Sequence, residues 1–302
     1  MKIIHGRIGC KRKISDKGIC VAIGNFDGIH IGHQSLIKKA LESNLTSMVM
    51  TFYPHPNLIT KPNFEYYFLT NKSEKIEQIR NLNPNYLFMV DFDIKGASKS
   101  PDEFISWLKS MNVLEIVCGS DYRFGHHAKG SISDLEKHFK VILCDNVNIN
   151  NNRVSSTNIK SWLKEGKIEL ANKALGRNYR ILGLVVHGSQ IGIKLGFPTA
   201  NIDTFGNIVP KDGVYAVRVI YNKKIYYGMA NIGHNPTCNY QLNQRLEVHL
   251  FDFDGNLYDK NVYVEFVKFW RDEKKFNCVN ELIEQLNNDK NDIKRWFYEN
   301  KS

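Results

Sequence analysis

The sequence contains no apolar run of about 18 residues, which a membrane-spanning helix would need. Residues 1–7 also lack the apolar stretch of a secretory signal peptide. The six cysteines are scattered without a Cys-x-x-Cys pair, so they predict reduced thiols and neither a disulfide framework nor a zinc site. Together these absences predict a cytoplasmic protein with no membrane partner.

The chain has little clustering of charge, although 41 basic and 31 acidic residues give it a formal net charge of +10. Its basic side chains are dispersed except at 11–13, so the surplus indicates small phosphorylated partners more than nucleic acid. Hydrophobic content of 42% is typical of a globular protein, and 302 residues suffice for two domains. We therefore expect small-molecule substrates, no nucleic acid, and a monomer or weak homo-oligomer.

The first half alternates apolar runs with amphipathic segments. Strands are predicted at 20–24, 46–53, 86–90, 114–119 and 140–145, and helices at 33–43, 72–81, 101–109, 131–138 and 155–175. Such alternation is typical of a parallel sheet with crossover helices, in which ligands bind beyond the carboxyl ends of the strands. Residues 1–180 are thus predicted to form an α/β domain.

After residue 181 the sequence changes to short β-rich runs separated by Gly, Pro, Asn and Asp. These runs are 181–187, 213–221, 224–232, 245–251 and 261–268, followed by a helical pattern from about 279 to 298. The spacing is typical of meander or Greek-key barrels. Residues 181–302 are predicted to form a mostly antiparallel β-barrel with a C-terminal helix.

The segment after the first predicted strand is the most informative part of the chain. An apolar run passes through a glycine turn into His30-x-Gly32-His33, which opens an amphipathic segment. A helix N-terminus favours anions, and histidines three residues apart lie on one face of its first turn. There they can bond a nucleoside triphosphate and favour the charge that develops on a pyrophosphate leaving group. The alternative is a helix cap with two incidental histidines.

The residues of this loop that we assign to the triphosphate, besides the two histidines, are Gly24, Asn25, Phe26, Asp27, Gly28 and Gly32. A second binding site for the same phosphates is expected at another helix N-terminus, which carries several hydroxyl side chains and a lysine in its first turn. Its residues are Ser155, Ser156, Thr157 and Lys160. The alternative for this segment is an ordinary Ser/Thr N-cap with a solvated lysine.

Two more motifs follow predicted strands at the same edge of the sheet. Pro54 and His55 belong to a rigid loop that could hold a planar phosphorylated ligand, although such turns are often only structural. Asp121 could accept from a ribose or base amine, and Arg123 could grip a phosphate bidentately. Read alone, the second motif is equally compatible with an ordinary loop.

Residues 187–201 are dense in glycine and end in Pro-Thr-Ala-Asn. Thr199 and Asn201 stand two apart on an extended segment, where their oxygens suit Mg²⁺. Glu247 lies on a β-run beside His249 and could take a proton from an attacking hydroxyl, although a lone strand glutamate is usually only solvated. The residues expected to approach phosphates in the glycine loop are Gly188, Gly192, Lys194 and Gly196.

In their order and spacing these motifs resemble those of bacterial bifunctional riboflavin kinase/FMN adenylyltransferases, also called prokaryotic FAD synthetases. The segments that carry the resemblance are 24–34, 51–56, 121–125, 155–157, 175–177, 196–201, 231–237, 246–249 and 271–276. The resemblance implies a Rossmann-like nucleotidyltransferase domain followed by a riboflavin kinase barrel. The barrel would phosphorylate riboflavin with Mg-ATP to FMN, and the first domain would adenylylate FMN to FAD with release of pyrophosphate.

The resemblance also implies roles for individual residues. His30 and His33 would hold the ATP phosphates during adenylylation, and Glu247 would be the base of the kinase. Mg-ATP would lie at Thr199 and Asn201. The flavin-binding residues that it implies are Pro54, His55, Asp121, Arg123 and Arg271. Five positions depart from the family pattern and put affinities and rates in doubt: Asn158, Lys160, Ile193, Asp259 and Trp270.

Two other functions remain open on the sequence. The first is a single-activity nucleotidyltransferase with a decayed kinase domain, for which Ile193 is the best support. The second is a non-catalytic module that binds flavin or RNA, which the basic charge favours weakly. Assays with riboflavin and FMN as separate substrates distinguish the first, and salt-dependent binding distinguishes the second.

Overall fold

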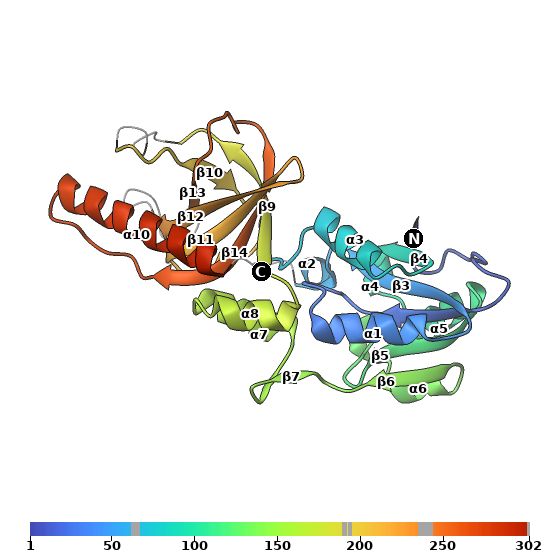
Figure 1. Ribbon diagram of the computed structural model, residues 1–302. Helices are drawn as coiled ribbons and strands as arrows, with labels where there is room; N and C mark the ends of the chain where they lie inside the picture. Colours follow the sequence, from blue (N-terminus) through green and yellow to red (C-terminus); the bar gives the residue numbers. More distant parts are fainter. Residues whose placement is uncertain (62–66, 189–191, 193–194, 235–243, 301–302) are drawn as a thin grey trace. The chain divides into compact units, whose positions relative to one another are not determined.

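Two units of different architecture make up the computed structural model, Met1–Ser156 and Thr157–Ser302. The structure describes residues 1–61, 67–188, 192, 195–234 and 244–300. In Figure 1 the first unit is coloured from blue to green and the second from yellow-green to red. Each unit has its own sheet and its own apolar core, and each is described by itself below.

The first unit is built on a six-stranded parallel sheet with the order β1-β4-β3-β2-β5-β6. Its strands are β1 (Lys2–Gly6), β2 (Ile19–Ile23), β3 (Thr46–Tyr53), β4 (Tyr86–Asp91), β5 (Val113–Gly119) and β6 (Lys140–Cys144). Its helices are α1 (Ile31–Leu41), α2 (Pro56–Thr60), α3 (Lys72–Asn81), α4 (Ile94–Ala97), α5 (Pro101–Ser110), the 3₁₀ turn η1 (His126–Ala128) and α6 (Ile132–Glu136). A short hairpin, β7 (Asn148–Ile149) and β8 (Asn152–Arg153), follows β6.

Helices cover both faces of this sheet. On one face, the sheet packs against α5 and α6 through a cluster that includes Trp107 and Leu135. On the other, it packs against α1 and α3 through Ile37, Ala40 and Ile79. Because both faces are covered, β2 consists of five fully buried apolar residues in succession, as expected for a central parallel strand.

The strand order places a topological switch point at β2 and β5. The chain runs from β2 outward through β3 and β4 on one side, and returns to β5 and β6 on the other. The loops that leave β2 and β5 therefore diverge and open a crevice at the carboxyl ends of these neighbouring strands. The predicted motifs at 24–33 and 121–125 follow these two strands.

The second unit is a closed antiparallel barrel with the order β10-β13-β12-β11-β14-β9. Its strands are β9 (Tyr179–Val186), β10 (Ala200–Asp203), β11 (Gly213–Tyr221), β12 (Lys224–His234), β13 (Gln244–Leu250) and β14 (Asn261–Arg271). Its helices are α7 (Ser156–Lys164), which begins at the last residue of the first unit, α8 (Ile168–Leu175) and α10 (Val279–Glu299). Figure 1 shows α10 lying along the outside of the barrel.

Alternate residues of the barrel strands face two different cores. Val214 and Ala216 of β11 and Met229 of β12 lie on the outer face, where Ile293 and Phe297 of α10 cover them. Because side chains alternate along a strand, the residues between these, such as Val217, point to the interior of the barrel. This assignment of faces decides which side chains of β13 can meet those of β10 and β12.

The predicted fold is confirmed, including nearly every predicted strand and helix. Four strands were not expected: β1 at the sheet edge, the hairpin strands β7 and β8, and the short β10. The predicted helix at 155–175 is two helices separated at Gly166, which adopts φ = 76°. The predicted boundary after residue 180 does not coincide with the division of the compact units at 156/157. The reason is that α8 packs against β9 and β14 of the barrel.

Candidate active sites

The loop between β2 and α1 brings His30 and His33 together at a helix N-terminus. His30 is the N-cap of α1, and its Nδ1 accepts the backbone N–H of His33 at 3.2 Å. The two imidazole rings stack with their centroids 3.6 Å apart. Gly32 lies close to the ring of His30, because a Cβ there would meet Nδ1 of His30 at 3.2 Å. The predicted pairing of the two histidines is therefore present, and one of them also caps the helix.

Side chain to backbone bonds fix this loop. Oδ1 of the buried Asp27 accepts the backbone N–H groups of Leu69 at 3.0 Å and Thr70 at 3.3 Å. Thr70 Oγ1 accepts the N–H of Gly28 at 3.1 Å, and Ser156 Oγ donates to the carbonyl of Asp27 at 2.8 Å. The side chain of Asp27, which we predicted to bind ATP, thus ties the loop to the segment before α3.

The carbonyl of Asn25 is a second anchor of the loop. It accepts from Nζ of the buried Lys75 at 2.7 Å and from Oγ1 of the buried Thr51 at 3.0 Å. Phe26 is also buried and meets the ring of His33 edge-on, at a centroid distance of 5.2 Å. The side chain of Phe26 therefore packs inside the loop, and the side chain of Asn25 remains exposed.

Burial makes His33 electrically neutral. Nδ1 of His33 is buried and has no hydrogen-bond partner among the residues that the structure describes. This burial, reinforced by electrostatic interactions with His30 and Lys75, holds the pKa of His33 well below its usual value. At neutral pH, His33 is therefore an uncharged hydrogen-bonding group beside a cationic lysine.

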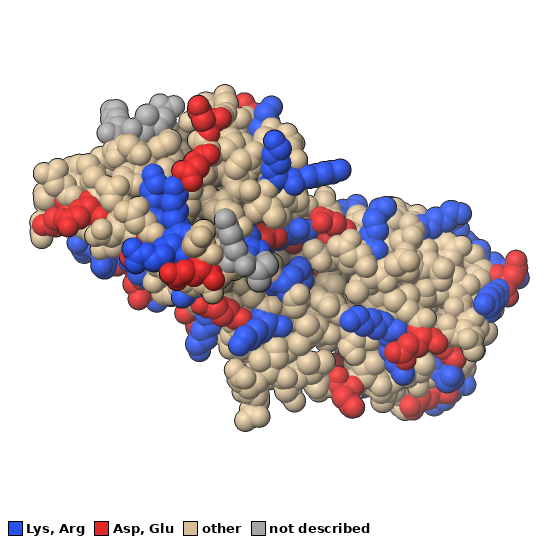
Figure 2. All heavy atoms as spheres, viewed as in Figure 1, with Lys and Arg blue, Asp and Glu red and all other residues tan. Residues whose placement is uncertain are grey.

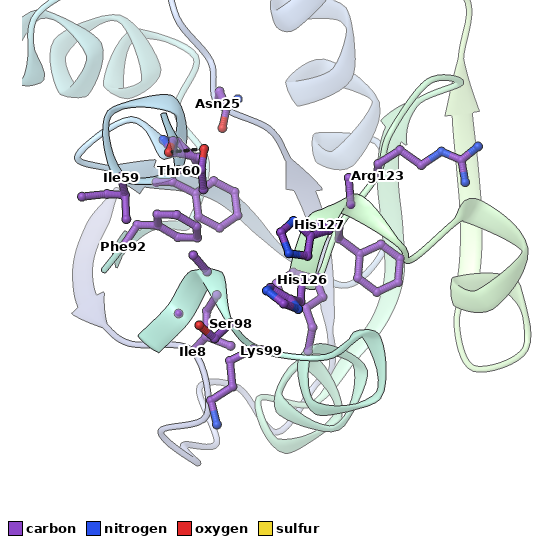
Figure 3. A pocket seen from close by; sticks show the side chains of 18 of the residues that line it. Ile8, Asn25, Ile59, Thr60, Phe92, Ser98, Lys99, Arg123, His126 and His127 are labelled. Atoms are coloured by element: carbon purple, nitrogen blue, oxygen red, sulfur yellow. Dashed lines mark hydrogen bonds between the residues drawn. The ribbon is translucent and has the colours of Figure 1, made fainter. Parts of the chain in front are cut away.

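A cavity of about 810 Å³ opens beside this loop, and Gly24 and Asn25 form part of its wall. Its other walls come from the ends of β3, β4 and β5 and from the segments after them. Aromatic rings dominate the lining: Phe52, Phe92, Phe104, Tyr122 and Phe124. Figure 3 shows Phe92 and Ile59 on one side of the cavity and the adjacent rings of His126 and His127 on another.

The predicted flavin residues of the first unit divide into two groups. Asp121 and Arg123 line the cavity, although Asp121 is paired with Arg153 at 2.6 Å and the guanidinium of Arg123 is turned away from the aromatic wall in Figure 3. Pro54 and His55 are not among the lining residues that the structure describes. His55 is buried and caps α2, since its Nδ1 accepts the N–H of Asn57 at 3.2 Å.

Sequence reasoning missed several other lining residues, including Phe92, Lys99, His126 and His127. They come from loops that no local motif marks. The sequence offered one weak signal for a turn at this place, the glycine of Arg123-Phe124-Gly125. Gly125 adopts φ = 72° and leads the chain into η1, which holds His126 and His127. Of the predicted hydroxyl cluster, Ser155 is half-buried, while Thr157 and Lys160 belong to the second unit.

In the barrel, strand pairing brings the predicted kinase residues together. Asn201 of β10 pairs in register with Glu247 of β13, and Asn231 of β12 pairs with Glu247 from the other side. Directly paired residues on one face have Cβ atoms about 4.5–5.5 Å apart. Thr199, just before β10, directs Oγ1 to Oε2 of Glu247 at 3.5 Å. The sequence motifs included Asn231, but we had not assigned it to the site.

The described glycines of the preceding loop pack on this polar group. A Cβ at Gly188 would meet the amide of Asn201 at 2.1 Å, and a Cβ at Gly192 would meet Thr199 Oγ1 at 3.2 Å. Gly196 is exposed and adopts φ = 80°. Lys194 and Ile193 lie outside the described residues. A second cavity, of about 290 Å³, adjoins Thr199 and is lined by Val185, Leu250, Phe253, Leu257 and Tyr258 among others.

Arg271, predicted near the flavin, is engaged with α10. Its Nε and Nη2 donate to the buried carboxylate of Asp289, with Nη2 at 2.6 Å from Oδ2. Gln285 donates to the same carboxylate at 2.8 Å. This bidentate pair holds the C-terminal helix to the end of β14.

The described residues contain no group of three or more His, Cys, Asp or Glu that could hold a metal ion. The candidate donors for Mg²⁺ are instead the hydroxyl oxygen of Thr199 and the amide oxygen of Asn201, which are the hard ligands that this ion prefers. No helix in the described part of the chain is long and apolar enough to cross a membrane.

Comparisons with known proteins match both parts of the chain. A family model for FAD synthetase matches residues 12–158, and one for riboflavin kinase matches residues 175–297. The bifunctional riboflavin kinase/FMN adenylyltransferase of Bacillus subtilis is 38% identical over 92% of both chains. That of Buchnera aphidicola subsp. Schizaphis graminum is 38% identical over 98% of this chain and 99% of its own.

A solved structure from Streptococcus pneumoniae, described as a macrolide-efflux protein, has the same fold. It is 32% identical with a TM-score of 0.88, covering 98% of this chain and 100% of its own. Its name differs from that of the curated relatives, whereas the two family models and those relatives agree with one another.

Proposed function

The chain belongs to the bacterial bifunctional riboflavin kinase/FMN adenylyltransferase family, and from this premise we propose which residues carry each reaction. As an enzyme of FAD biosynthesis, it phosphorylates riboflavin with ATP to FMN and then adenylylates FMN with ATP to FAD. The assignment of residues rests on the geometry of the two sites described above.

We assign adenylylation to the N-terminus of α1. Oxygen of the FMN phosphate attacks the α-phosphorus of ATP, and the bond to pyrophosphate breaks. His30 and His33 lie where the phosphate chain meets the helix N-terminus, and their ring N–H groups donate to it as charge develops on the leaving group. The observation that carries this assignment is the stacked His30–His33 pair beside a cavity that Gly24 and Asn25 line.

That cavity is the proposed flavin site. Its volume of about 810 Å³ lies within the range of small-molecule pockets, and its aromatic lining suits a planar isoalloxazine ring. The site retains the predicted Asp121 and Arg123 and adds Phe92, His126 and His127. Pro54 and His55 act indirectly in this proposal, because they set the turn into α2, from which Pro56 and Ile59 reach the cavity.

We assign the kinase reaction to the row of polar residues formed by Asn201 of β10, Glu247 of β13 and Asn231 of β12. Glu247 takes the proton of the riboflavin 5′-hydroxyl as its oxygen attacks the γ-phosphorus and ADP leaves. Thr199 and Asn201 would hold Mg²⁺ together with the ATP phosphates, and the bound ion would neutralise phosphate charge. Gly188 and Gly192 fit this site because a Cβ at either would fill the space beside those oxygens.

The cavity of about 290 Å³ beside Thr199 is the proposed place of the adenine ring. Its lining of Val185, Leu250, Phe253 and Tyr258 is apolar and aromatic, and Asn256 supplies polar groups at its edge. A flat, weakly polar base fits such a lining, and its phosphates would then extend past Thr199 toward Glu247.

The test is an assay that supplies riboflavin and FMN separately with Mg-ATP and resolves FMN from FAD by chromatography. We expect FMN and then FAD from riboflavin, FAD from FMN, and no product from either when Mg²⁺ is chelated. FAD from FMN without any FMN from riboflavin would instead identify a single-activity enzyme with a decayed kinase domain. FMN formation from riboflavin that persists without a divalent ion would exclude the proposed metal site.

For its surroundings, we propose a monomer or weak homo-oligomer in the cytoplasm that acts on small molecules. The described cysteines form no disulfide with one another, which suits a reducing compartment. Figure 2 shows Lys and Arg interspersed with Asp and Glu on the visible face, without the continuous basic field that nucleic acids favour. Sedimentation at several concentrations and RNA binding at several salt concentrations test these two points.

A further inference from the structure

His249 is a buried histidine that neither proposed reaction uses. It stands on β13 two residues after Glu247, so both side chains lie on the same outer face of the barrel. Its side chain is almost completely buried, between the rings of Phe197 at 5.4 Å and Phe251 at 5.9 Å. A polar ring in such apolar surroundings is expected to make a specific hydrogen bond.

One nitrogen of His249 has a defined partner. Nδ1 lies 2.9 Å from the carbonyl oxygen of Pro198, and because a carbonyl can only accept, Nδ1 carries the proton and donates. Nε2 is buried with no hydrogen-bond partner among the described residues. The hydrogen bond to the carbonyl therefore defines the tautomer of His249, with a proton on Nδ1.

This hydrogen bond acts where the backbone ladder stops. The pairing of β10 with β13 begins at Ala200 opposite Val248, so the sheet does not hold Thr199 or Pro198. Proline has no backbone N–H, and its carbonyl is the one backbone group by which it can be tied. The side chain of His249 donates a hydrogen bond to that carbonyl. It therefore holds this segment to β13 beyond the last backbone pair of the two strands.

We propose that His249 is a positioning residue of the kinase site, whose Nδ1–H holds Pro198 and thereby places Thr199 against Glu247. The inference rests on the proposed roles of Thr199 and Glu247. Thr199 Oγ1 lies 3.5 Å from Glu247 Oε2, at the outer limit of a hydrogen bond, so that bond alone fixes Thr199 weakly. The restraint on Thr199 comes from its neighbour Pro198 on one side and the start of β10 on the other.

The competing explanation is that the ring of His249 only fills space between Phe197 and Phe251. A space-filling role predicts lower stability in any smaller variant and normal turnover in the molecules that remain folded. A positioning role predicts slower turnover in folded molecules, because small displacements of groups that hold the phosphates cost large factors in rate. It also predicts rescue by a substitute that keeps an N–H near the position of Nδ1.

His249→Asn and His249→Leu form a matched pair, since both side chains branch at Cγ and are similar in size, but only asparagine can donate. In full-length protein with riboflavin and Mg-ATP, we expect His249→Leu to lower kinase kcat by about 10–100-fold and to raise KM for ATP, with KM for riboflavin nearly unchanged. We expect His249→Asn to stay within about fivefold of wild type. FAD formation from supplied FMN is the internal control for folding and should be unchanged in both.

Equal kinase losses in the two variants, or no loss in His249→Leu, would overturn the positioning role. Glu247→Gln belongs in the same assay, because normal turnover in that variant would show that the proposed kinase site itself is wrong. Should the leucine variant fail to fold, ¹⁵N-histidine NMR of the wild-type protein decides independently. A proton on Nδ1 of His249 supports the inference, and a proton on Nε2 contradicts it.

Discussion

The two units position their reactive side chains by different physical means. In the first, His30 and His33 stand on a loop and a helix N-terminus, and side chains from distant segments tie that loop by its backbone. In the second, Asn201 and Glu247 meet because β10 and β13 pair in register. The first site depends on separate side chain to backbone hydrogen bonds, here called tethers, and each can be removed by one substitution. The second depends on the register of two paired strands, which is kept or lost for all of their residues together.

This difference predicts how each site fails. Removing one tether should destabilise the β2–α1 loop only by the contribution of that hydrogen bond. A slip of one residue between β10 and β13 would turn Glu247 to the opposite face of the barrel. We therefore expect graded effects from substitutions behind the first site, and abrupt effects from changes that disturb the barrel.

The largest expected effect concerns the integrity of the barrel. A fragment of residues 157–302 should fold by itself, whereas a fragment that starts at the predicted boundary, residue 181, should not. The shorter fragment loses the buried Trp162, Leu163 and Ile168 and also Tyr179 of β9. Each such side chain contributes about 1.5–3 kcal/mol, and together they approach the whole stability of a typical domain. Circular dichroism and thermal unfolding of the two fragments test this, and equal stability would contradict it.

The next effect separates the two reactions at the barrel site. Glu247→Gln keeps the size of the side chain but removes the base, so FMN formation should fall by about 10²–10⁴-fold. Riboflavin binding should be retained, because the register of β13 is unchanged. FAD formation from supplied FMN should proceed normally, since it uses the first unit. Isothermal titration with riboflavin and the two chromatographic assays measure these quantities, and unchanged kinase turnover would make Glu247 a structural residue.

The reciprocal change lies at the loop site. His30→Ala removes a preorganised donor and the N-cap of α1, so FAD formation should fall by about 10²–10³-fold. FMN formation from riboflavin should be unaffected, because the kinase residues lie in the barrel. Equal losses of both activities in a folded variant would contradict the assignment of the two reactions to separate units.

How far the sequence could predict these sites follows from the same difference. The pair His30 and His33 could be predicted because a helix turn, which is local, brings them together. The contacts of Glu247 with Thr199 and Asn201 depend on the pairing of β13 with the short β10, which was not expected as a strand. The motifs singled out these residues, while their partners in space depend on long-range strand order.

Two residues that were predicted to bind ligands also make framework contacts in the structure. Asp27 ties the loop to Leu69 and Thr70, and Arg271 is bound to Asp289 of α10. A charged side chain in a motif can bind a ligand or can hold two segments of the protein together. The sequence does not show which, because the role depends on what lies near the side chain in the folded structure. The cavity residues His126 and His127 were missed for the related reason that no periodic pattern marks an irregular loop.

A smaller, graded effect is expected from loss of a tether. Asp27→Ala leaves the N–H groups of Leu69 and Thr70 without their acceptor and should lower the free energy of unfolding of the first unit by about 1–3 kcal/mol. Asp27→Asn keeps an acceptor oxygen and should cost less. FAD formation should fall with the same ranking, while FMN formation stays constant. If Asp27→Asn raises KM for ATP as much as Asp27→Ala does, the carboxylate contacts ATP and is more than a tether.

The smallest expected effect is the pH dependence that the buried histidine gives to the first unit. His33 has a pKa well below its usual value in the folded chain, because burial, His30 and Lys75 all oppose its charge. In the unfolded chain the same side chain takes up its proton near pH 6.5. Below that pH the unfolded state binds more protons than the folded state, so the stability contributed by His33 is complete above pH 6.5 and is lost as the pH falls.

The loss attributable to His33 cannot exceed about 1.4 kcal/mol per pH unit, since one proton is involved. We expect His33→Asn to remove this slope between pH 6.5 and 5, and to leave the wild-type and variant stability curves parallel above pH 7. Hydrogen exchange of peptides from β2 and α1 in the full-length protein reports on the first unit separately from the barrel. If the free energy of unfolding of the variant falls with pH below 6.5 as steeply as that of the wild type, His33 is not the group whose protonation causes the loss.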